Sequence, residues 1–101
     1  MNIPKSIKIG GKNYAVEISE NFYFGAANVK AEILFDEQII RIKQGHTETM
    51  QCAFLHEMIH GILEFIGETE HNEKFVEAIA QALFAVIADN PEIFMRQEDI
   101  V

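Results

Sequence analysis

The chain has 101 residues and a mass of 11.5 kDa, with 49% hydrophobic and 24% charged side chains and a formal net charge of −8. This length suits one compact domain with one hydrophobic core, and this composition excludes a disordered or low-complexity chain. The charge is uneven, because residues 1–50 are neutral overall and residues 51–101 carry all of the excess acid. An acidic half repels phosphate groups, so we expect neither nucleic acid nor an anionic membrane as a partner.

The first half alternates apolar and polar residues, as half-buried β-strands do. The alternation predicts a hairpin of residues 3–9 and 14–18 around a turn at Gly10-Gly11. Two further strands are expected over residues 30–35 and 38–43. The prediction is a small, mostly antiparallel sheet of three or four strands. Four aromatic residues are assigned to the core rather than to the wall of a site: Phe22, Tyr23, Phe24 and Phe35.

The second half changes to helical spacing. Thr47 is predicted as the N-cap of a first helix that Gly67 ends. A second helix is expected from residue 72 or 73 to about residue 89, before Asn90-Pro91 stops it, and a short helix or turn over 91–96. One stripe of the second helix is predicted to face the core: Val76, Ile79, Ala80, Leu83, Phe84 and Ile87. The fold class is therefore α+β, with a small sheet followed by two packed helices.

Export and membrane insertion are not indicated by the sequence. Residues 1–5 do not lead into the apolar core of a signal peptide, and the most apolar stretch, residues 53–66, contains two histidines and two glutamates. The lone cysteine, Cys52, cannot form a disulfide within the chain and is expected to be buried and inert. We therefore expect one soluble domain, 1–101, in the cytoplasm, with a monomer as the default state.

The chemistry of the sequence is concentrated in the motif His56-Glu57-Met58-Ile59-His60. Residues four apart lie one above the other on a helix, so both imidazoles leave the same face and can bind one Zn²⁺ ion. Glu57 is offset by one position, which places its carboxylate beside the metal as a general base for a zinc-bound water. Two core histidines that hydrogen-bond their neighbours are the alternative.

A catalytic zinc site needs a third protein ligand. Glu64 is excluded, because eight residues of helix separate it from His56 by about 12 Å along the axis. Glu73 and Glu77 lie one turn apart on the second helix, and we favour Glu73 as the ligand and Glu77 as a hydrogen-bond partner of a ligand imidazole, with Glu77 as the alternative ligand. His71 could be a ligand, a donor to the reacting carbonyl or a plain loop histidine. His46 is expected to be solvated.

With these motifs, the chain resembles the gluzincin zinc peptidases, and most closely the minimal gluzincins, or minigluzincins. It is also similar to ImmA/IrrE-like and SprT-like putative metallopeptidases of bacteria and phages. The resemblance extends from Gly11-Lys12-Asn13-Tyr14 to Asp89-Asn90-Pro91. It depends mainly on the histidine motif and on residues 72–77, Asn-Glu-Lys-Phe-Val-Glu, where the family pattern often reads Glu-x-x-Ala-Asp.

The resemblance implies a zincin-like domain in which His56, His60 and Glu73 hold one Zn²⁺ and Glu57 is the general base of peptide-bond hydrolysis. It also implies an edge strand that pairs with an extended peptide or protein substrate, as β-augmentation does. The candidate strand is residues 38–43, with Ile39, Ile40, Arg41 and Ile42 at its centre, and an ordinary sheet strand is the alternative.

The sequence is compatible with three functions. The first is a zinc metallopeptidase, whose activity could be weak or latent because 101 residues leave little chain for a specificity subdomain. The second is a proteolytically silent zinc-binding module that regulates or binds a partner. The third is a metal-free α+β interaction domain, in which the histidine motif is a coincidence.

Overall fold

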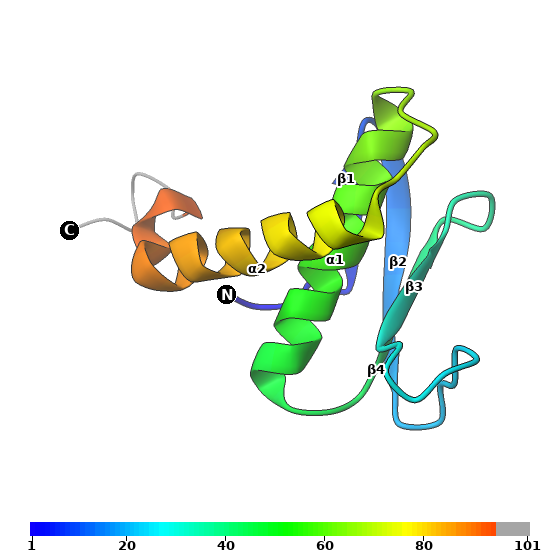
Figure 1. Ribbon diagram of the computed structural model, residues 1–101, viewed down its shortest axis with the longest axis horizontal. Coiled ribbons are helices and arrows are strands. Elements are labelled where there is room, and N and C mark those ends of the chain that lie inside the picture. Colours follow the sequence, from blue (N-terminus) through cyan, green and yellow to red (C-terminus); the bar gives the residue numbers. More distant parts are fainter. Residues whose placement is uncertain (95–101) are drawn as a thin grey trace.

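The computed structural model describes residues 1–94 and confirms the α+β fold class, with a sheet followed by two helices (Figure 1). The elements are β1 (Ser6–Ile9), β2 (Lys12–Ser19), β3 (Ala31–Leu34), β4 (Ile39–Lys43), α1 (Thr47–Phe65), α2 (Glu73–Asp89) and a short 3-10 turn, η1 (Pro91–Phe94). The turn agrees with the short helix expected after the second helix, and the last two residues of that expected range lie outside the described residues.

The sheet has the strand order β1-β2-β4-β3. β1 and β2 form the expected hairpin, and its turn needs glycine because Gly10 and Gly11 both have positive φ, at 58° and 88°. β3 and β4 are also antiparallel, whereas β2 and β4 are parallel, so the sheet is mixed. The chain leaves β2, forms β3 at the far edge and returns as β4 into the gap between them.

This order corrects the prediction that residues 38–43 form an edge strand. β4 pairs with β2 on one side and with β3 on the other, through Ile39, Ile40, Arg41 and Ile42. The backbone N–H and C=O groups of β4 are therefore hydrogen-bonded to its two neighbouring strands, and β4 has no free edge that could pair with a substrate. Ile40 and Ile42 are completely buried, as a strand enclosed by neighbours and covered by a helix requires. The sheet edge on this side belongs to β3.

α1 lies across one face of the sheet and contacts β3, β4 and β1 (Figure 1). Phe54 and Leu55 are buried in the core, and Gly61 brings the helix close to Ile9 of β1 and Ile33 of β3. The predicted N-cap is wrong by one residue, because His46 occupies that position, Thr47 is already helical, and no side chain caps the helix. The C-terminal prediction is confirmed by Gly67, with φ at 85°.

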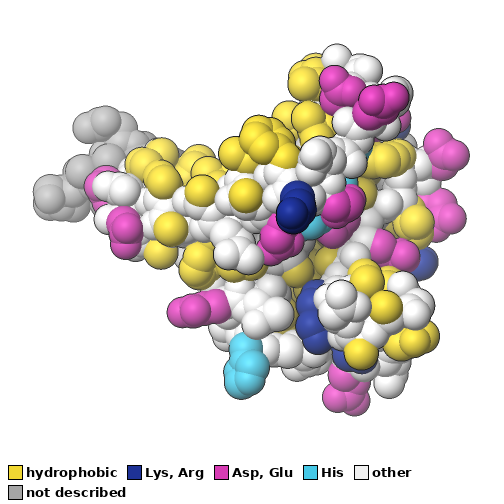
Figure 2. All heavy atoms as spheres, in the orientation of Figure 1, with side chains coloured by type: hydrophobic (Ala, Val, Ile, Leu, Met, Phe, Trp, Pro, Cys, Tyr) yellow, Lys and Arg dark blue, Asp and Glu magenta, His cyan; other side chains and the backbone are white. Residues whose placement is uncertain are grey.

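α2 packs against α1 and extends beyond the body of the molecule (Figure 1). Its N-cap is Asn72, whose side chain accepts a hydrogen bond from the Phe75 backbone N–H at 3.0 Å. Val76, Ala80 and Ile87 are buried as predicted. Ile79 is 40% exposed, because within residues 1–94 α2 packs against α1 and η1 alone. Hydrophobic side chains are visible along the outer face of α2 (Figure 2).

The assignment of four aromatic residues to the core is confirmed for Phe35 and wrong for Tyr23. Phe35 is partly buried and packs against the core, and it also lines the cleft described below. Tyr23 is 71% exposed in the segment between β2 and β3. Phe22 and Phe24 are half-buried and contact each other with centroids 5.9 Å apart, and the Arg41 guanidinium lies 5.9 Å from the Phe22 ring. Among residues 1–94, no helix combines the length and apolar character that crossing a bilayer demands.

Candidate metal centre

The histidine motif lies in the middle of α1, on the side of the helix that meets α2. The one-turn spacing places the Nε2 atoms of His56 and His60 3.2 Å apart. His60 is 8% exposed, and its surroundings lower its pKa because burial disfavours the imidazolium. The neutral ring is the form that binds a metal, so burial prepares His60 for this role.

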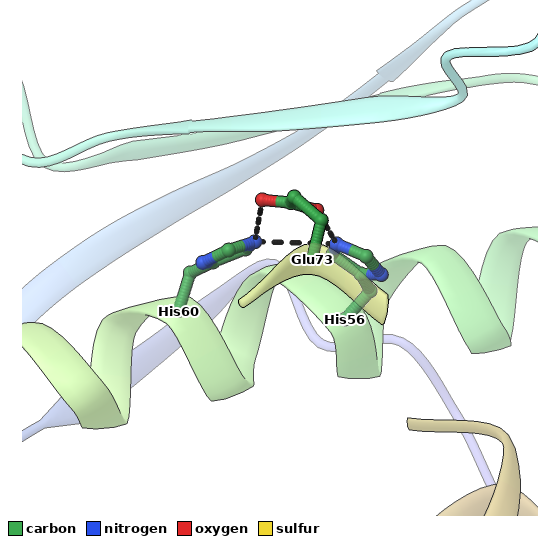
Figure 3. A group of neighbouring side chains, drawn as sticks. All are labelled: His56, His60 and Glu73. Carbon is green, nitrogen blue, oxygen red and sulfur yellow. Dashed lines mark hydrogen bonds and ion pairs between the residues drawn. The ribbon is translucent and has the colours of Figure 1, made fainter. Parts of the chain in front are cut away.

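Glu73 completes the group from the first residue of α2. Its carboxylate lies across both imidazoles, with Oε2 3.0 Å from His56 Nε2 and Oε1 2.9 Å from His60 Nε2 (Figure 3). The turn at Gly67 and the cap at Asn72 reverse the chain so that the start of α2 faces the middle of α1. His56, His60 and Glu73, the three predicted ligands, are therefore close enough to hold one metal ion.

The hydrogen bonds around this group leave lone pairs pointing at its centre. His56 has a carboxylate oxygen at each ring nitrogen, Glu77 Oε2 at 2.7 Å from Nδ1 and Glu73 Oε2 at 3.0 Å from Nε2. A carboxylate only accepts, so when Nε2 and Glu73 share a cation, the proton of neutral His56 lies on Nδ1. His56 Nε2 then has a free lone pair that faces the Glu73 carboxylate. Unscreened lone pairs repel one another, and a cation among them removes that repulsion.

The spacing of these atoms also fits a metal. Four ligands at zinc–ligand distances of about 2.0–2.2 Å in a tetrahedron lie about 3.3–3.6 Å from one another. The three distances in the group, 2.9, 3.0 and 3.2 Å, are slightly shorter, so a small outward movement of the side chains would give zinc geometry. Two imidazoles and one carboxylate are a donor set that zinc accepts, with a fourth position left for water.

Glu77 occupies the position expected for a supporting residue. One oxygen accepts from His56 Nδ1–H, and the other accepts from Gln81 Nε2 at 2.9 Å. The bond from Gln81, followed by that from His56, lowers the pKa of Glu77. An ionised Glu77 fixes the tautomer and the orientation of His56. Gln81 was not identified from the sequence, although its position one turn after Glu77 on the same helix face was a usable signal.

Glu57 lies next to the group and is 8% exposed. Burial raises the pKa of its carboxyl to about 7, and the negative charges of Glu73, Glu32 and Glu77 add to the rise, against an opposing contribution from His56. A carboxyl with a pKa near neutrality is suited to both accepting and donating a proton. A metal ion bound beside it would favour the carboxylate form.

His71, left open by the sequence, lies beside His60. The two Nδ1 atoms are 2.7 Å apart, and His71 Nε2 lies 2.6 Å from the Glu68 carbonyl oxygen. Its outer face meets Phe35 edge-on, at a centroid distance of 6.5 Å. His71 is not part of the three-residue group found within residues 1–94, so its contact is with a ligand rather than with the centre of the site.

The group opens into a cleft of about 1010 Å³. The cleft runs between β3 and α2, and its lining includes Ala31, Glu32 and Ile33 of β3 and Gln81 of α2. Cys52 also lines it and is only half-buried, so the expectation of a fully buried cysteine is wrong. Its partial burial and the negative charges of Glu77 and Glu48 raise the pKa of the thiol. Glu64 and His46 are exposed and lie outside the metal-binding group, as expected.

No known protein family, curated protein or solved structure matches this chain.

Proposed function

We propose that the chain is a zinc-dependent metallopeptidase of the gluzincin kind. The observation that carries this proposal is the convergence of His56 Nε2, His60 Nε2 and the Glu73 carboxylate beside the buried carboxyl of Glu57. A structural zinc site usually has four protein ligands, whereas this group has three among residues 1–94 and opens into a cleft. Three ligands and an open position are typical of catalytic zinc.

In this proposal His56, His60 and Glu73 hold the ion. Bound zinc supplies a Lewis acid that polarises the scissile carbonyl and lowers the pKa of water. Glu57 takes a proton from the attacking water and delivers it to the leaving amine. Burial raises its pKa to about 7, and a bound cation would lower that pKa again, so Glu57 would be ionised and ready to accept the proton at neutral pH. Glu77 keeps His56 in the tautomer that presents Nε2 to the ion.

The substrate class is an extended peptide. β3 is paired with β4 along one side, and within the described part of the chain no strand pairs with its other side. Residues of β3 line the cleft that leads to the metal-binding group. An unpaired edge offers backbone N–H and C=O groups to an extended chain, so β3 takes the role first assigned to residues 39–42.

Zinc content and peptide cleavage, measured on the same preparations, test the proposal. Zinc-loaded wild-type protein is incubated with a mixture of fluorescence-quenched peptides, beside Glu57→Gln, His56→Ala and the control Glu64→Gln. We expect Glu57→Gln to keep about one zinc per chain and lose turnover, because the amide cannot accept the proton. His56→Ala should lose both, and Glu64→Gln, an exposed change on the same helix, should lose neither.

The outcomes separate the candidate functions. Full cleavage by Glu57→Gln would contradict the assigned general base. One zinc per chain without turnover of any peptide would favour the silent zinc-binding module. Absence of zinc from the wild type, even after zinc is added back, would favour a metal-free interaction domain.

A further inference from the structure

We propose that His71 is a positioning residue, which holds His60 in the Nδ1–H tautomer and thereby directs the His60 Nε2 lone pair at the metal. The inference deepens the proposed metal centre and rests on it. The supporting partner of a ligand histidine is usually a carboxylate or a carbonyl oxygen, as Glu77 is for His56. Here the partner of His60 is a second imidazole.

The backbone of the loop after α1 determines which nitrogen of His71 carries the proton. A backbone carbonyl oxygen can only accept, so the 2.6 Å contact with the Glu68 oxygen requires a hydrogen on His71 Nε2. A neutral imidazole carries one N–H group. His71 Nδ1 is then a bare acceptor, and the loop after α1 fixes the tautomer through its own backbone.

The tautomer of His71 in turn determines which nitrogen of His60 carries a proton. The Nδ1 atoms of His60 and His71 are 2.7 Å apart, so one of them must donate. His71 Nδ1 accepts, and His60 Nδ1–H therefore donates. With its proton on Nδ1, His60 directs the Nε2 lone pair at a cation that it would share with Glu73, whose Oε1 lies 2.9 Å away and competes for a proton on Nε2 when no cation is bound. His56 Nε2 lies 3.2 Å from the same atom.

The ring geometry agrees with this bond. The planes of His60 and His71 are inclined by only 18°, and their centroids are 4.9 Å apart. A hydrogen bond of this length between the edges of two nearly coplanar rings places their centroids about 5 Å apart, whereas face-to-face stacking would not bring the two nitrogens into line. The contact is therefore an in-plane N–H···N hydrogen bond.

The tautomer of each ligand histidine is thus fixed by an acceptor, and the two acceptors come from different elements. Glu77 on α2 accepts from His56, and His71 in the preceding loop accepts from His60. Phe35 and His71 form a T-shaped pair, with ring centroids 6.5 Å apart. The loop between the helices is consequently part of the metal centre, although it supplies no ligand from among the described residues.

The test compares a variant that keeps the acceptor with one that removes it. In His71→Asn the side-chain oxygen can lie close to the position of Nδ1, and His71→Leu has a similar shape without a polar atom. Zinc affinity is measured by competition with a chromophoric chelator, with His46→Leu as the control at an exposed histidine outside the site. We expect His71→Leu to lose about 10-fold or more in affinity, and His71→Asn to stay within about 3-fold of the wild type.

The tautomer is measured directly, without metal, by long-range ¹H–¹⁵N correlation NMR of the wild type at pH 8. The expected spectrum shows His60 protonated on Nδ1 and His71 protonated on Nε2. In the spectrum of His71→Leu, we expect His60 to lose its preference for the Nδ1–H tautomer. A His60 protonated on Nε2 in the wild type would overturn the inference even if zinc binds. Equal loss of affinity in His71→Asn and His71→Leu would also overturn it, because the ring itself would then be required.

The two measurements separate this inference from the proposed function. If the wild type binds no zinc, the metallopeptidase proposal fails, and the NMR spectrum of the same protein still decides whether His71 sets the tautomer of His60. If zinc binds and His71→Leu keeps its full affinity, the metal centre stands and the role of His71 is refuted. Should His71→Leu not fold, the wild-type spectrum and the asparagine variant carry the decision.

Discussion

Replacing Glu57 by glutamine should make the metal-free protein more stable, and by an amount that grows with pH. Glu57 is almost fully buried next to the three predicted ligands. Burial and the neighbouring glutamates raise its pKa to about 7 from an ordinary value of 4.5. Between these two values the folded protein holds a proton on Glu57 that the unfolded chain has already lost. The free energy of unfolding therefore falls as pH rises through this window.

The size of the effect follows from the pKa difference. Each pKa unit corresponds to about 1.4 kcal/mol, so Glu57 reduces the stability of the metal-free protein by about 3 kcal/mol once the pH is above 7. A domain of this size is stable by only about 5–15 kcal/mol. Glutamine has nearly the same shape and does not titrate, so the variant avoids this loss.

Urea unfolding of chelator-treated wild type and Glu57→Gln, at intervals from pH 5 to pH 8, measures the difference. Every other titrating group is common to both proteins, so the gap between their unfolding free energies isolates Glu57. We expect this gap to widen by about 2–3 kcal/mol over the range. Glu64→Gln, an exposed change on the same helix, should show a constant gap.

A constant gap for Glu57→Gln would refute the reasoning, because Glu57 would then titrate in the folded protein as it does in the unfolded chain. Zinc gives a second check on the same preparations. A divalent cation next to Glu57 stabilises its carboxylate, so saturating zinc should reduce the pH-dependent widening. A widening that zinc leaves unchanged would show that the ion does not bind beside Glu57.

Three further predictions concern the metal and the core. Protein purified without chelator should contain about one zinc per chain by elemental analysis, and His56→Ala and Glu73→Ala should lose it. Glu77→Ala should keep the zinc with about 10-fold weaker affinity, because it removes the support of His56. Loss of zinc with Glu77→Ala alone would make Glu77 the third ligand. Free zinc at about 100 times its dissociation constant should stabilise the wild type by about 2.7 kcal/mol, seen as a rise in melting temperature that Glu73→Ala abolishes. Ile40→Ala, at a completely buried position, should lower the unfolding free energy by about 2–5 kcal/mol, whereas Ile66→Ala on the exposed end of α1 should change it by less than about 1 kcal/mol.

The helices and the metal-binding group were predictable because their signals are local. The spacing of His56 and His60 on a helix fixes the geometry of the pair whatever surrounds it. Asn72 caps α2 through a contact three residues away, which the sequence also contains. Glu73 required one further assumption, that the second helix folds back on the first, and the short connection between them makes that return the simplest path.

The position of β4 was not predictable in the same way. Strand order depends on contacts between distant segments, and the hydrophobic alternation of residues 39–43 is the same in a central strand as in an edge strand. A parallel pairing of β2 with β4 also requires β3 to form outside them, which no local pattern encodes. Tyr23 was misplaced for a related reason, since an aromatic side chain in a connecting segment is buried only if another element happens to cover it.

The burial of Glu57 connects the fold to the proposed chemistry. On α1, Phe54, Leu55 and Gly61 pack toward the sheet, and the histidine motif has to lie on the side that α2 covers. Position 57 falls between these two faces, so the fold that buries the core also takes the Glu57 carboxyl out of water. This placement destabilises the metal-free protein above pH 7, and a cation bound beside Glu57 would favour the carboxylate form that a general base needs. Stability lost at position 57 without metal is therefore expected to return when a cation binds, which couples folding of this domain to its metal.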